Sequence, residues 1–338
     1  MSTAGNVVLG LTCGALLAAF APACSSHTPV TYTVLSPPRD WAAHPAVVDV
    51  PAPSPAPAAP ADLYAVSDAH GGYDRLAALL AGAGILAAVP PDPSSPTWKA
   101  GAATLVVVGD LIDKGPQPLE VMDLFMALEG RAAAAGGRVV VLAGNHEAEF
   151  FADPGNSKAD GTDGVDKELR ARGIDPVALA SGKDPHGQWL RDRPFAARIG
   201  AWFFAHAGDT HGRSVGELDA LLRAAVEAHP NYADANLTGA DSLLESRDWY
   251  GDTAVAPRYL AALGAKHIVF GHDPNALGAR GAIAVAQDGA LLRVDCGMSP
   301  DVNDSTGKVL HVRKDGTDDV AEELDAQGNV RLVWRGPS

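Results

Sequence analysis

The stretch Thr104-Leu105-Val106-Val107-Val108-Gly109-Asp110-Leu111-Ile112-Asp113-Lys114-Gly115 decides more of this chain's architecture than any other. Its first five residues form a run rich in β-branched apolar side chains, which predicts a strand buried on both faces. The polar residues follow directly, at the carboxyl end of the strand, where α/β proteins place active-site loops. A carboxylate at that place, Asp110, can bridge two cations with its two oxygens.

Four other short stretches carry polar residues of the same kind in a fixed order: Asp68-Ala69-His70, Gly144-Asn145-His146-Glu147, His206-Ala207-Gly208 and Gly271-His272. With Asp110 they supply Asp, His, Asp, Asn, His and His, a ligand set for two metal ions that share one carboxylate. Asp68 and His70 alternate on an extended stretch, point to one side and can complete one site. Asn145, His206 and His272 can complete the other. Mixed nitrogen and oxygen ligands favour Mn, Fe or Zn over Ca.

This ligand set points to phosphoester chemistry. Two metal ions about 3.5–4 Å apart can hold a bridging hydroxide and bind the phosphoryl oxygens of an in-line displacement. His146, next to Asn145, is placed to protonate the leaving alkoxide, and Asp113 can orient His146 and raise its pKa. Lys114, Arg247 and the Asn145 amide are the candidates for binding the phosphate oxygens.

Strands and helices alternate along the rest of the chain, which predicts an α/β (α+β) fold with sheets covered by helices. From residue 282 strands dominate, separated by turn signals such as Asp288-Gly289. Residues 153–192 lack a strand pattern, so we interpret them as an inserted, partly helical segment, either a surface loop or a wall of the substrate groove. The earlier predicted elements are Leu63–Ser67, Tyr73–Ala83, Thr104–Val108, Pro118–Leu128, Arg138–Leu142, Ile199–Phe204, Ser214–Ala228, Pro257–Leu263 and Lys266–Phe270.

The N-terminal region differs in composition from the rest of the chain. Val7 to Phe20 is apolar and is followed by small residues, which predicts an export signal over 1–24. Cys24 then stands where a bacterial lipoprotein carries its acylated cysteine, and an ordinary cleaved signal is the alternative. Residues 25–61 are rich in Pro and Ala and are interpreted as an extended linker. We therefore expect a catalytic domain over 62–338 and an exported protein, either periplasmic or anchored to a membrane through Cys24.

Composition restricts the partners further. The 338 residues carry 26 Lys+Arg against 41 Asp+Glu, a formal net charge of -15, so the basic footprint of a nucleic-acid-binding protein is absent. The acidic pairs Asp318-Asp319 and Glu322-Glu323 are interpreted as a solvated face. Of the three Cys residues, only Cys296 lies beyond the signal region, so an intrachain disulfide is not expected if Cys24 is lipidated.

The five polar stretches together resemble the calcineurin-like metallophosphoesterase superfamily. Within it they resemble the phosphoprotein phosphatase branch, with its blocks G-D-x-H-G, G-D-x-x-D-R-G, G-N-H-E, H-G-G and a late single His. Val294-Asp295-Cys296-Gly297-Met298-Ser299 and Gly187-Gln188-Trp189-Leu190-Arg191 are similar to the Shewanella-like phosphatases. The resemblance implies a β-sandwich with helices outside and a dinuclear metal centre at strand ends. It implies one metal on Asp68, His70 and Asp110, the other on Asp110, Asn145, His206 and His272, and His146 as the acid paired with Asp113.

Three positions depart from the pattern of this branch. Lys114 stands where the branch usually has Arg, which replaces a bidentate grip on phosphate by a point charge. Ala207 replaces a Gly. Residues 243–246 lack the Pro-Leu-Trp pattern that usually precedes the Arg, so the assignment of Arg247 rests on alignment alone.

Three functions are weighed on these grounds. The first is a metal-dependent phosphomonoesterase that acts on phosphorylated Ser/Thr or Tyr of proteins, or on a small phosphoester. The second is a phosphoesterase for nucleotides or dinucleoside polyphosphates, since relatives share the same blocks. The third is a tethered binding protein without catalysis, which the intact ligand set disfavours.

Overall fold

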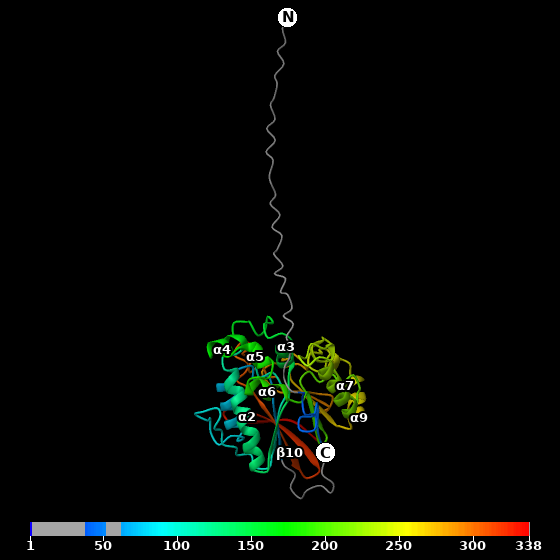
Figure 1. Ribbon diagram of the computed structural model, residues 1–338. Helices are drawn as coiled ribbons and strands as arrows, with labels where there is room; N and C mark the ends of the chain where they lie inside the picture. Colours follow the sequence, from blue (N-terminus) through cyan, green and yellow to red (C-terminus); the bar gives the residue numbers. More distant parts are fainter. Residues whose placement is uncertain (2–37, 52–61, 338) are drawn as a thin grey trace. The chain divides into compact units, whose positions relative to one another are not determined.

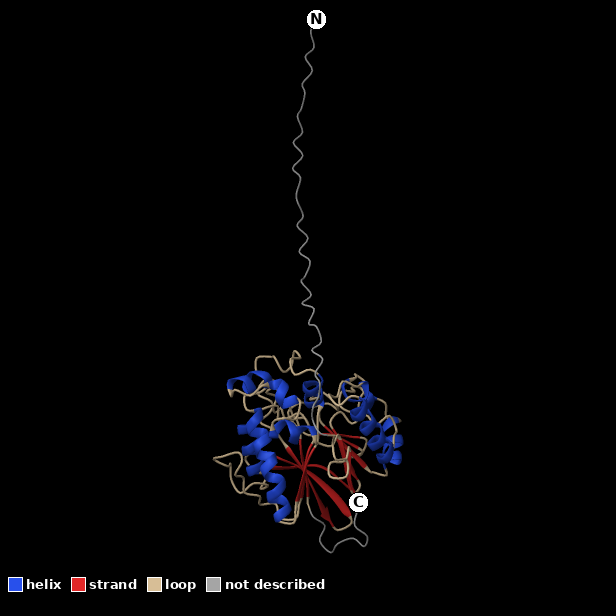
Figure 2. Ribbon diagram, in the orientation of Figure 1, coloured by secondary structure: helices blue, strands red, loops and turns tan. Residues whose placement is uncertain are grey.

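The computed structural model describes residue 1, residues 38–51 and residues 62–337 of the chain. The expected export signal, Cys24 and the Pro-rich part of the expected linker, residues 52–61, lie outside the described residues. The described part contains two six-stranded sheets with helices around them, as Figures 1 and 2 show. The predicted α/β class, a β-sandwich flanked by helices, is confirmed.

The first sheet carries the later polar stretches. Its neighbours pair in the order β1-β5-β6-β7-β9-β8, and β6, β7 and β9 run parallel. Parallel strands place their carboxyl ends at one edge of a sheet, so the residues after β6 and β7 emerge together. The strands are β1 (Val47–Val50), β5 (Ala196–Ile199), β6 (Trp202–Ala205), β7 (His267–Phe270), β8 (Ala284–Ala286) and β9 (Leu291–Arg293).

The second sheet carries the earlier polar stretches. Its order is β12-β11-β10-β2-β3-β4, with β2, β3 and β4 parallel and the last three strands of the chain antiparallel to their neighbours. The residues after β2, β3 and β4 therefore also leave the sheet at one edge. The strands are β2 (Leu63–Val66), β3 (Thr104–Val107), β4 (Arg138–Val141), β10 (Val309–Asp315), β11 (Asp318–Leu324) and β12 (Val330–Pro337).

The apolar run of β3 explains how the sheets are layered. Val106 and Val108 belong to the apolar cluster that also holds Phe204 and Val269 of the first sheet, whereas Leu105 and Val107 belong to the larger cluster that the helices complete. Successive side chains of a strand point to opposite faces, so a strand between another sheet and a helix layer needs apolar residues at every position. The continuous apolar run predicted this double burial correctly.

Helices cover the sheets on opposite flanks. α2 packs against β4 of the second sheet and α7 against β1 of the first, and Figure 1 shows the two helices on opposite sides. No helix within residues 38–51 and 62–337 is both long and apolar enough to span a membrane. The longer helices are α1 (Tyr73–Gly82), α2 (Pro118–Ala134), α3 (Asn145–Ala152), α7 (Val215–Ala228) and α9 (Val255–Leu263). The shorter ones are α4 (Val165–Ala171), α5 (Pro176–Ala180), α6 (Pro185–Arg191), α8 (Ala235–Thr238) and the 3-10 turn η1 (Trp249–Gly251).

Two predicted boundaries change in the structure. β1 lies inside the segment 25–61 that was expected as linker, and it pairs in parallel with β5, so the folded part of the chain begins before residue 62. The single strand predicted over Ile199–Phe204 is a hairpin of β5 and β6 instead. Gly200, with φ of +58°, lies in the turn between them, a backbone conformation that glycine adopts without strain.

The acidic pairs near the C-terminus are the clearest correction. Asp319 and Glu323 are buried in β11, an inner strand of the second sheet, and not on a solvated face. Lys314 binds Asp319 with 2.7 Å between Nζ and Oδ1, and Arg331 binds Glu323 with 2.6 Å between Nη2 and Oε2. Buried carboxylates are tolerated when they are paired, and these partners come from the two neighbouring strands.

Candidate active site

The first group of predicted metal ligands gathers where β2 and β3 end. His70 Nε2 lies 3.7 Å from Asp68 Oδ1 and 3.4 Å from Asp110 Oδ2. All three side chains are buried. The backbone amides of Asp68 and His70 donate to carbonyls of the loop after β3, at 3.1 Å to Gly109 O and 2.9 Å to Asp110 O. These bonds hold the two loops together and turn the three side chains toward one point.

The second group gathers around the other oxygen of the same carboxylate. His206 Nε2 lies 3.2 Å from Asp110 Oδ1 and 3.0 Å from Asn145 Oδ1. His272 Nδ1 lies 3.2 Å from Asn145 Oδ1. Asp110 therefore presents Oδ2 to His70 and Oδ1 to His206, which is the geometry expected of a bridging carboxylate.

Backbone carbonyls set which nitrogen of each histidine faces the centre. His70 Nδ1 donates to Ile112 O at 2.9 Å, His206 Nδ1 donates to Val108 O at 2.8 Å, and His272 Nε2 donates to Glu245 O at 3.1 Å. A carbonyl only accepts, so each of these nitrogens carries the proton, and the opposite nitrogen offers a lone pair inward. Such hydrogen bonds are the usual support of metal-binding histidines.

Electrostatics agree with a cation-binding centre. Burial lowers the pKa of His70 well below its usual range and lowers that of His272 to about 2, so both rings are neutral, the form that binds metal. Burial acts in the same sense on His206, but Asp110 outweighs it and raises the pKa of His206 to about 10. The Asp110 carboxylate therefore favours positive charge at the place that His206 Nε2 faces.

All six predicted ligand residues thus come together, and they fit two metal ions. Two sets of three side chains, His70–Asp110–His146 and Asp110–His206–His272, bring their ligand atoms within 4.8 Å of one another, so His146, predicted as the acid, also faces the centre. Asp68 and Asn145 join these sets through their contacts with His70 and His206. The two groups share Asp110, and the centre combines nitrogen and carboxylate ligands, a donor set typical of transition metals.

His146 and Asp113 form a buried pair beside this centre. His146 Nδ1 lies 2.7 Å from Asp113 Oδ2, and His146 Nε2 lies 3.9 Å from Asp110 Oδ2. The other Asp113 oxygen, Oδ1, accepts a hydrogen bond of 2.9 Å from the backbone amide of Val165, the first residue of α4. The segment 153–192 therefore contains helices and holds Asp113 in place.

The two predicted phosphate-binding cations lie on opposite sides of the ligand set. Lys114 Nζ is 3.1 Å from His70 Nε2, on the side of the first group. Arg247 is half-exposed, and its Nη1 lies 3.6 Å from Oδ1 of Asp273, the residue after His272. Lys114 therefore lies at the first group, whereas Arg247 lies beside the residue that follows His272.

The backbone of the site is strained. Residues other than glycine rarely adopt positive φ, and each such residue costs about 1 kcal/mol or more, which is sustained where the surrounding structure enforces it. Such outliers cluster at functional sites. The predicted site residues with positive φ are Asp68 (56°), His70 (44°), Asp110 (55°), Asp113 (62°), Lys114 (54°) and His272 (66°).

Glu147 has a role that the sequence analysis did not assign. Its fully buried carboxylate accepts backbone hydrogen bonds from Gly144 at 2.7 Å, from Asp110 at 3.0 Å and from Leu111 at 2.7 Å. Glu147 therefore joins the loop that carries the bridging carboxylate to the start of α3. Glu147 stands three residues after the N-cap Gly144 and accepts from its amide, which is the half of a capping box that a glycine N-cap allows, so the usual Ser/Thr signal is absent from the sequence.

Glu245 is a second residue that the sequence analysis missed. Its Oε1 accepts a hydrogen bond of 2.9 Å from Asn145 Nδ2. Burial raises the pKa of Glu245 to about 7, and a hydrogen bond with Glu149 acts in the same sense. No motif in the sequence marks this contact, because the two bonded residues are 100 positions apart.

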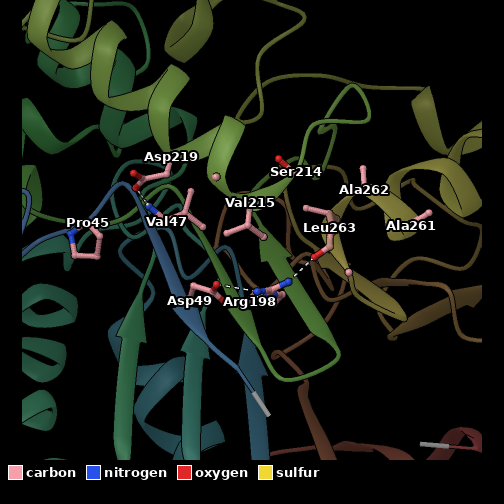
Figure 3. Close-up of a pocket in the computed structure, with 12 residues that line it drawn as sticks. Pro45, Val47, Asp49, Arg198, Ser214, Val215, Asp219, Ala261, Ala262 and Leu263 are labelled. Carbon is pink, nitrogen blue, oxygen red and sulfur yellow. Dashed lines mark hydrogen bonds and ion pairs between the residues drawn. The ribbon is translucent and has the colours of Figure 1, made fainter. Parts of the chain in front are cut away.

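A separate surface pocket of about 560 Å³, shown in Figure 3, lies between β1, β5 and the ends of α7 and α9. Arg198 in this pocket binds Asp49, with 2.8 Å between Nη2 and Oδ2, and donates to Leu263 O at 2.7 Å. The described residues that line the pocket include none of the predicted ligands, so it is not the candidate active site.

The fold and the site together are those of a metallophosphoesterase. The family model of the calcineurin-like phosphoesterases matches residues 62–276. The chain belongs to this family, and the resemblance inferred from the five polar stretches is confirmed.

Several relatives are similar to the chain. It is 24% identical to Shewanella-like protein phosphatase 2 of Arabidopsis thaliana over 76% of each chain. It is 28% identical to the symmetrical bis(5'-nucleosyl)-tetraphosphatase of Methylococcus capsulatus, over 48% of this chain and 51% of that protein. Over 88 residues the chain is 41% identical to an uncharacterised protein of Schizosaccharomyces pombe, and this stretch covers 26% of this chain and 25% of that protein.

Solved structures share the fold. The cold-active protein-tyrosine phosphatase of a psychrophilic Shewanella species matches with a TM-score of 0.66 at 22% identity, over 86% of this chain and 82% of that one. A protein serine/threonine phosphatase of Saccharomyces cerevisiae matches with a TM-score of 0.56 at 18% identity, over 87% and 85%. Family membership, relatives and site together support a hydrolase that acts on phosphoesters and leave its substrate open.

Proposed function

We propose that this protein is a metal-dependent phosphomonoesterase that removes phosphate from phosphorylated Ser/Thr or Tyr residues of proteins. The observation that carries the proposal is the Asp110 carboxylate, which offers one oxygen to His70 and the other to His206. Two metal ions bound there, Mn, Fe or Zn, supply positive charge to the phosphoryl oxygens and lower the pKa of an attacking water.

The remaining residues have separate tasks in the proposed reaction. His146 donates the proton from Nε2 to the leaving oxygen, because its Nδ1 is bound to Asp113. Asp113 keeps the ring in that orientation and stabilises its positive charge. Lys114 and Arg247 bind the phosphate oxygens.

The test is metal-dependent hydrolysis of an aryl phosphate. Chelator-treated protein should be inactive and should regain activity on addition of Mn²⁺. Asp110→Asn should lower kcat on the aryl phosphate by at least about 100-fold, and His146→Asn should lower kcat by about the same factor on a phosphoserine peptide, whose leaving alkoxide needs a proton. Full activity of the chelated protein, with metal content verified as zero, would refute the proposal.

The relatives favour a protein substrate, with one competing candidate. The match to a plant protein phosphatase covers 76% of each chain, whereas the match to the tetraphosphatase covers about half of each. The second candidate is therefore hydrolysis of dinucleoside polyphosphates. Equal amounts of enzyme should be assayed on phosphoserine, phosphothreonine and phosphotyrosine peptides and on diadenosine tetraphosphate. A kcat/KM higher for the last substrate would select the second candidate.

We also propose that the protein is exported and held at a membrane by lipidated Cys24. The apolar stretch Val7 to Phe20 and the small residues before Cys24 support this proposal. Fractionation of cells that produce the full chain should place it with membranes, and Cys24→Ser should release it into the soluble exported fraction. Recovery of both forms from the cytoplasm would contradict the proposal.

A further inference from the structure

Glu245 lies in the segment 243–246, which lacks the Pro-Leu-Trp pattern usual in the phosphoprotein phosphatase branch. We propose that Glu245 is a positioning residue, whose carboxylate orients the Asn145 amide so that its oxygen faces the metal centre. This inference deepens the proposed function and rests on it. It concerns a residue that the family pattern does not supply.

The two ends of the Asn145 amide have different partners. Only the oxygen of an amide binds metal, but the oxygen and nitrogen ends have nearly the same size. Asn145 Oδ1 lies within 3.0 Å of His206 Nε2 and 3.2 Å of His272 Nδ1. Asn145 Nδ2 donates to Glu245 Oε1 at 2.9 Å. A carboxylate accepts and does not donate, so it favours the orientation that turns the oxygen inward.

Glu245 also acts on a second ligand of the same group. Its backbone oxygen accepts a hydrogen bond of 3.1 Å from His272 Nε2, which leaves Nδ1 of His272 facing Asn145. One residue therefore sets the orientation of an amide and the protonated nitrogen of a histidine. A substitution at position 245 removes the carboxylate and keeps the backbone oxygen, so the two effects can be separated.

A cation from the segment 153–192 holds the carboxylate in place. Lys158 Nζ lies 2.6 Å from Glu149 Oε2 and 3.6 Å from Glu245 Oε1. Without this charge two neighbouring carboxylates would repel each other. Lys158 thus links the inserted segment to the support of Asn145.

The proposal predicts a selective defect in metal binding. Asn145, His206 and His272 form one side of the centre, whereas Asp68 and His70 form the other. Loss of a residue that orients a metal ligand typically costs about 10-fold to 100-fold in metal affinity. Glu245→Ala should therefore lower the affinity for one of the two metal ions by about that factor and leave the affinity for the other unchanged.

The experiment measures metal binding without substrate. Metal-free full-length protein is titrated with Mn²⁺ by calorimetry and with Co²⁺ by visible absorption, whose ligand-field bands report the geometry of each site. Glu245→Gln keeps an oxygen that accepts from Asn145, so it should restore most of the affinity that Glu245→Ala loses. Asp160→Ala removes an exposed carboxylate of the segment 153–192, and it should change both affinities less than threefold.

Each outcome decides the proposal. Selective loss in Glu245→Ala, with recovery in Glu245→Gln, supports it. Parental affinity for both ions in Glu245→Ala refutes the positioning role alone, and the proposed function stands. Equal losses in Glu245→Ala and Asp160→Ala also refute it, because they indicate general disruption of the site. A parental protein that binds neither Mn²⁺ nor Co²⁺ overturns both this role and the proposed function.

Discussion

The pairing of His146 with Asp113 makes a quantitative prediction about proton transfer. Asp113→Asn replaces the oxygen that lies 2.7 Å from His146 Nδ1, and both side chains are at most 3% exposed. A hydrogen bond between charged groups contributes about 1.5–3 kcal/mol. Because each 1.36 kcal/mol in the barrier is a factor of ten, kcat should fall by about 10-fold to 160-fold.

The substitution is close to isosteric, so its effect should be confined to chemistry. An Asn at position 113 still offers an oxygen to the Val165 amide, which now donates to Asp113 Oδ1 at 2.9 Å. The unfolding temperature and the metal content should therefore stay near the parental values. Asp160→Asn removes a carboxylate from an exposed position of the same inserted segment and serves as the matched control, with no expected change in kcat.

The assay compares two leaving groups. A phosphoserine peptide releases a poorly stabilised alkoxide that needs a proton, whereas p-nitrophenyl phosphate releases a stabilised phenolate that needs it much less. The full loss should appear on the peptide and a loss of less than about threefold on the aryl phosphate. Adding Asp113→Asn to His146→Asn should cause no further loss, because both changes remove one function. Equal losses on both substrates, at parental metal content, would refute the role of His146 as the acid.

Three further predictions concern single positions around the centre. Lys114→Arg should offer two donors to phosphate instead of one and tighten product inhibition by inorganic phosphate by about threefold to tenfold; an unchanged inhibition constant and kcat would contradict a phosphate contact. Gly109→Ala should abolish metal binding and lower the unfolding temperature in a thermal melt, because φ is +85° and a Cβ would lie 2.7 Å from Gly144 Cα and 2.8 Å from His206 Nδ1. Burial raises the pKa of the Cys296 thiol above its ordinary value, so the reactive thiolate stays scarce and iodoacetamide labelling, followed by peptide mass mapping, should not increase between pH 7 and pH 10 in the native protein. An increase through pH 9, as for an exposed thiol, would show that Cys296 is accessible.

The sequence predicted the central strands well for a specific physical reason. β2, β3 and β4 are buried on both faces, so each reads as a mainly apolar run shortly before one of the polar stretches. α7 was equally clear, because Ser214 and Glu217 form a capping box at its start. The elements whose stability depends on distant partners were missed or misassigned.

β11 shows why such elements escape prediction. Its acidic residues come in two adjacent pairs separated by Val320 and Ala321, so the segment lacks the alternation of a half-buried strand and suits a solvated surface. Only the pairing with β10 and β12 brings Lys314 and Arg331 to the buried carboxylates Asp319 and Glu323. The acidic residues of a segment do not show which Lys or Arg side chains will pair with them, so the sequence alone predicted that Asp319 and Glu323 face solvent.

The sequence by itself determined the chemical identity and the order of the metal ligands, because each ligand lies within four residues of a strand end and local patterns define strand ends. Only the tertiary structure decided which atom of each ligand faces the metal centre. The proton-bearing nitrogens of His70, His206 and His272 are set by carbonyls of residues far away or on neighbouring loops, and the Asn145 amide by Glu245. Hydrogen bonds act over about 3 Å in space regardless of separation along the chain. The order of the strands in the two sheets brings these partners together, and a single sequence does not show that order.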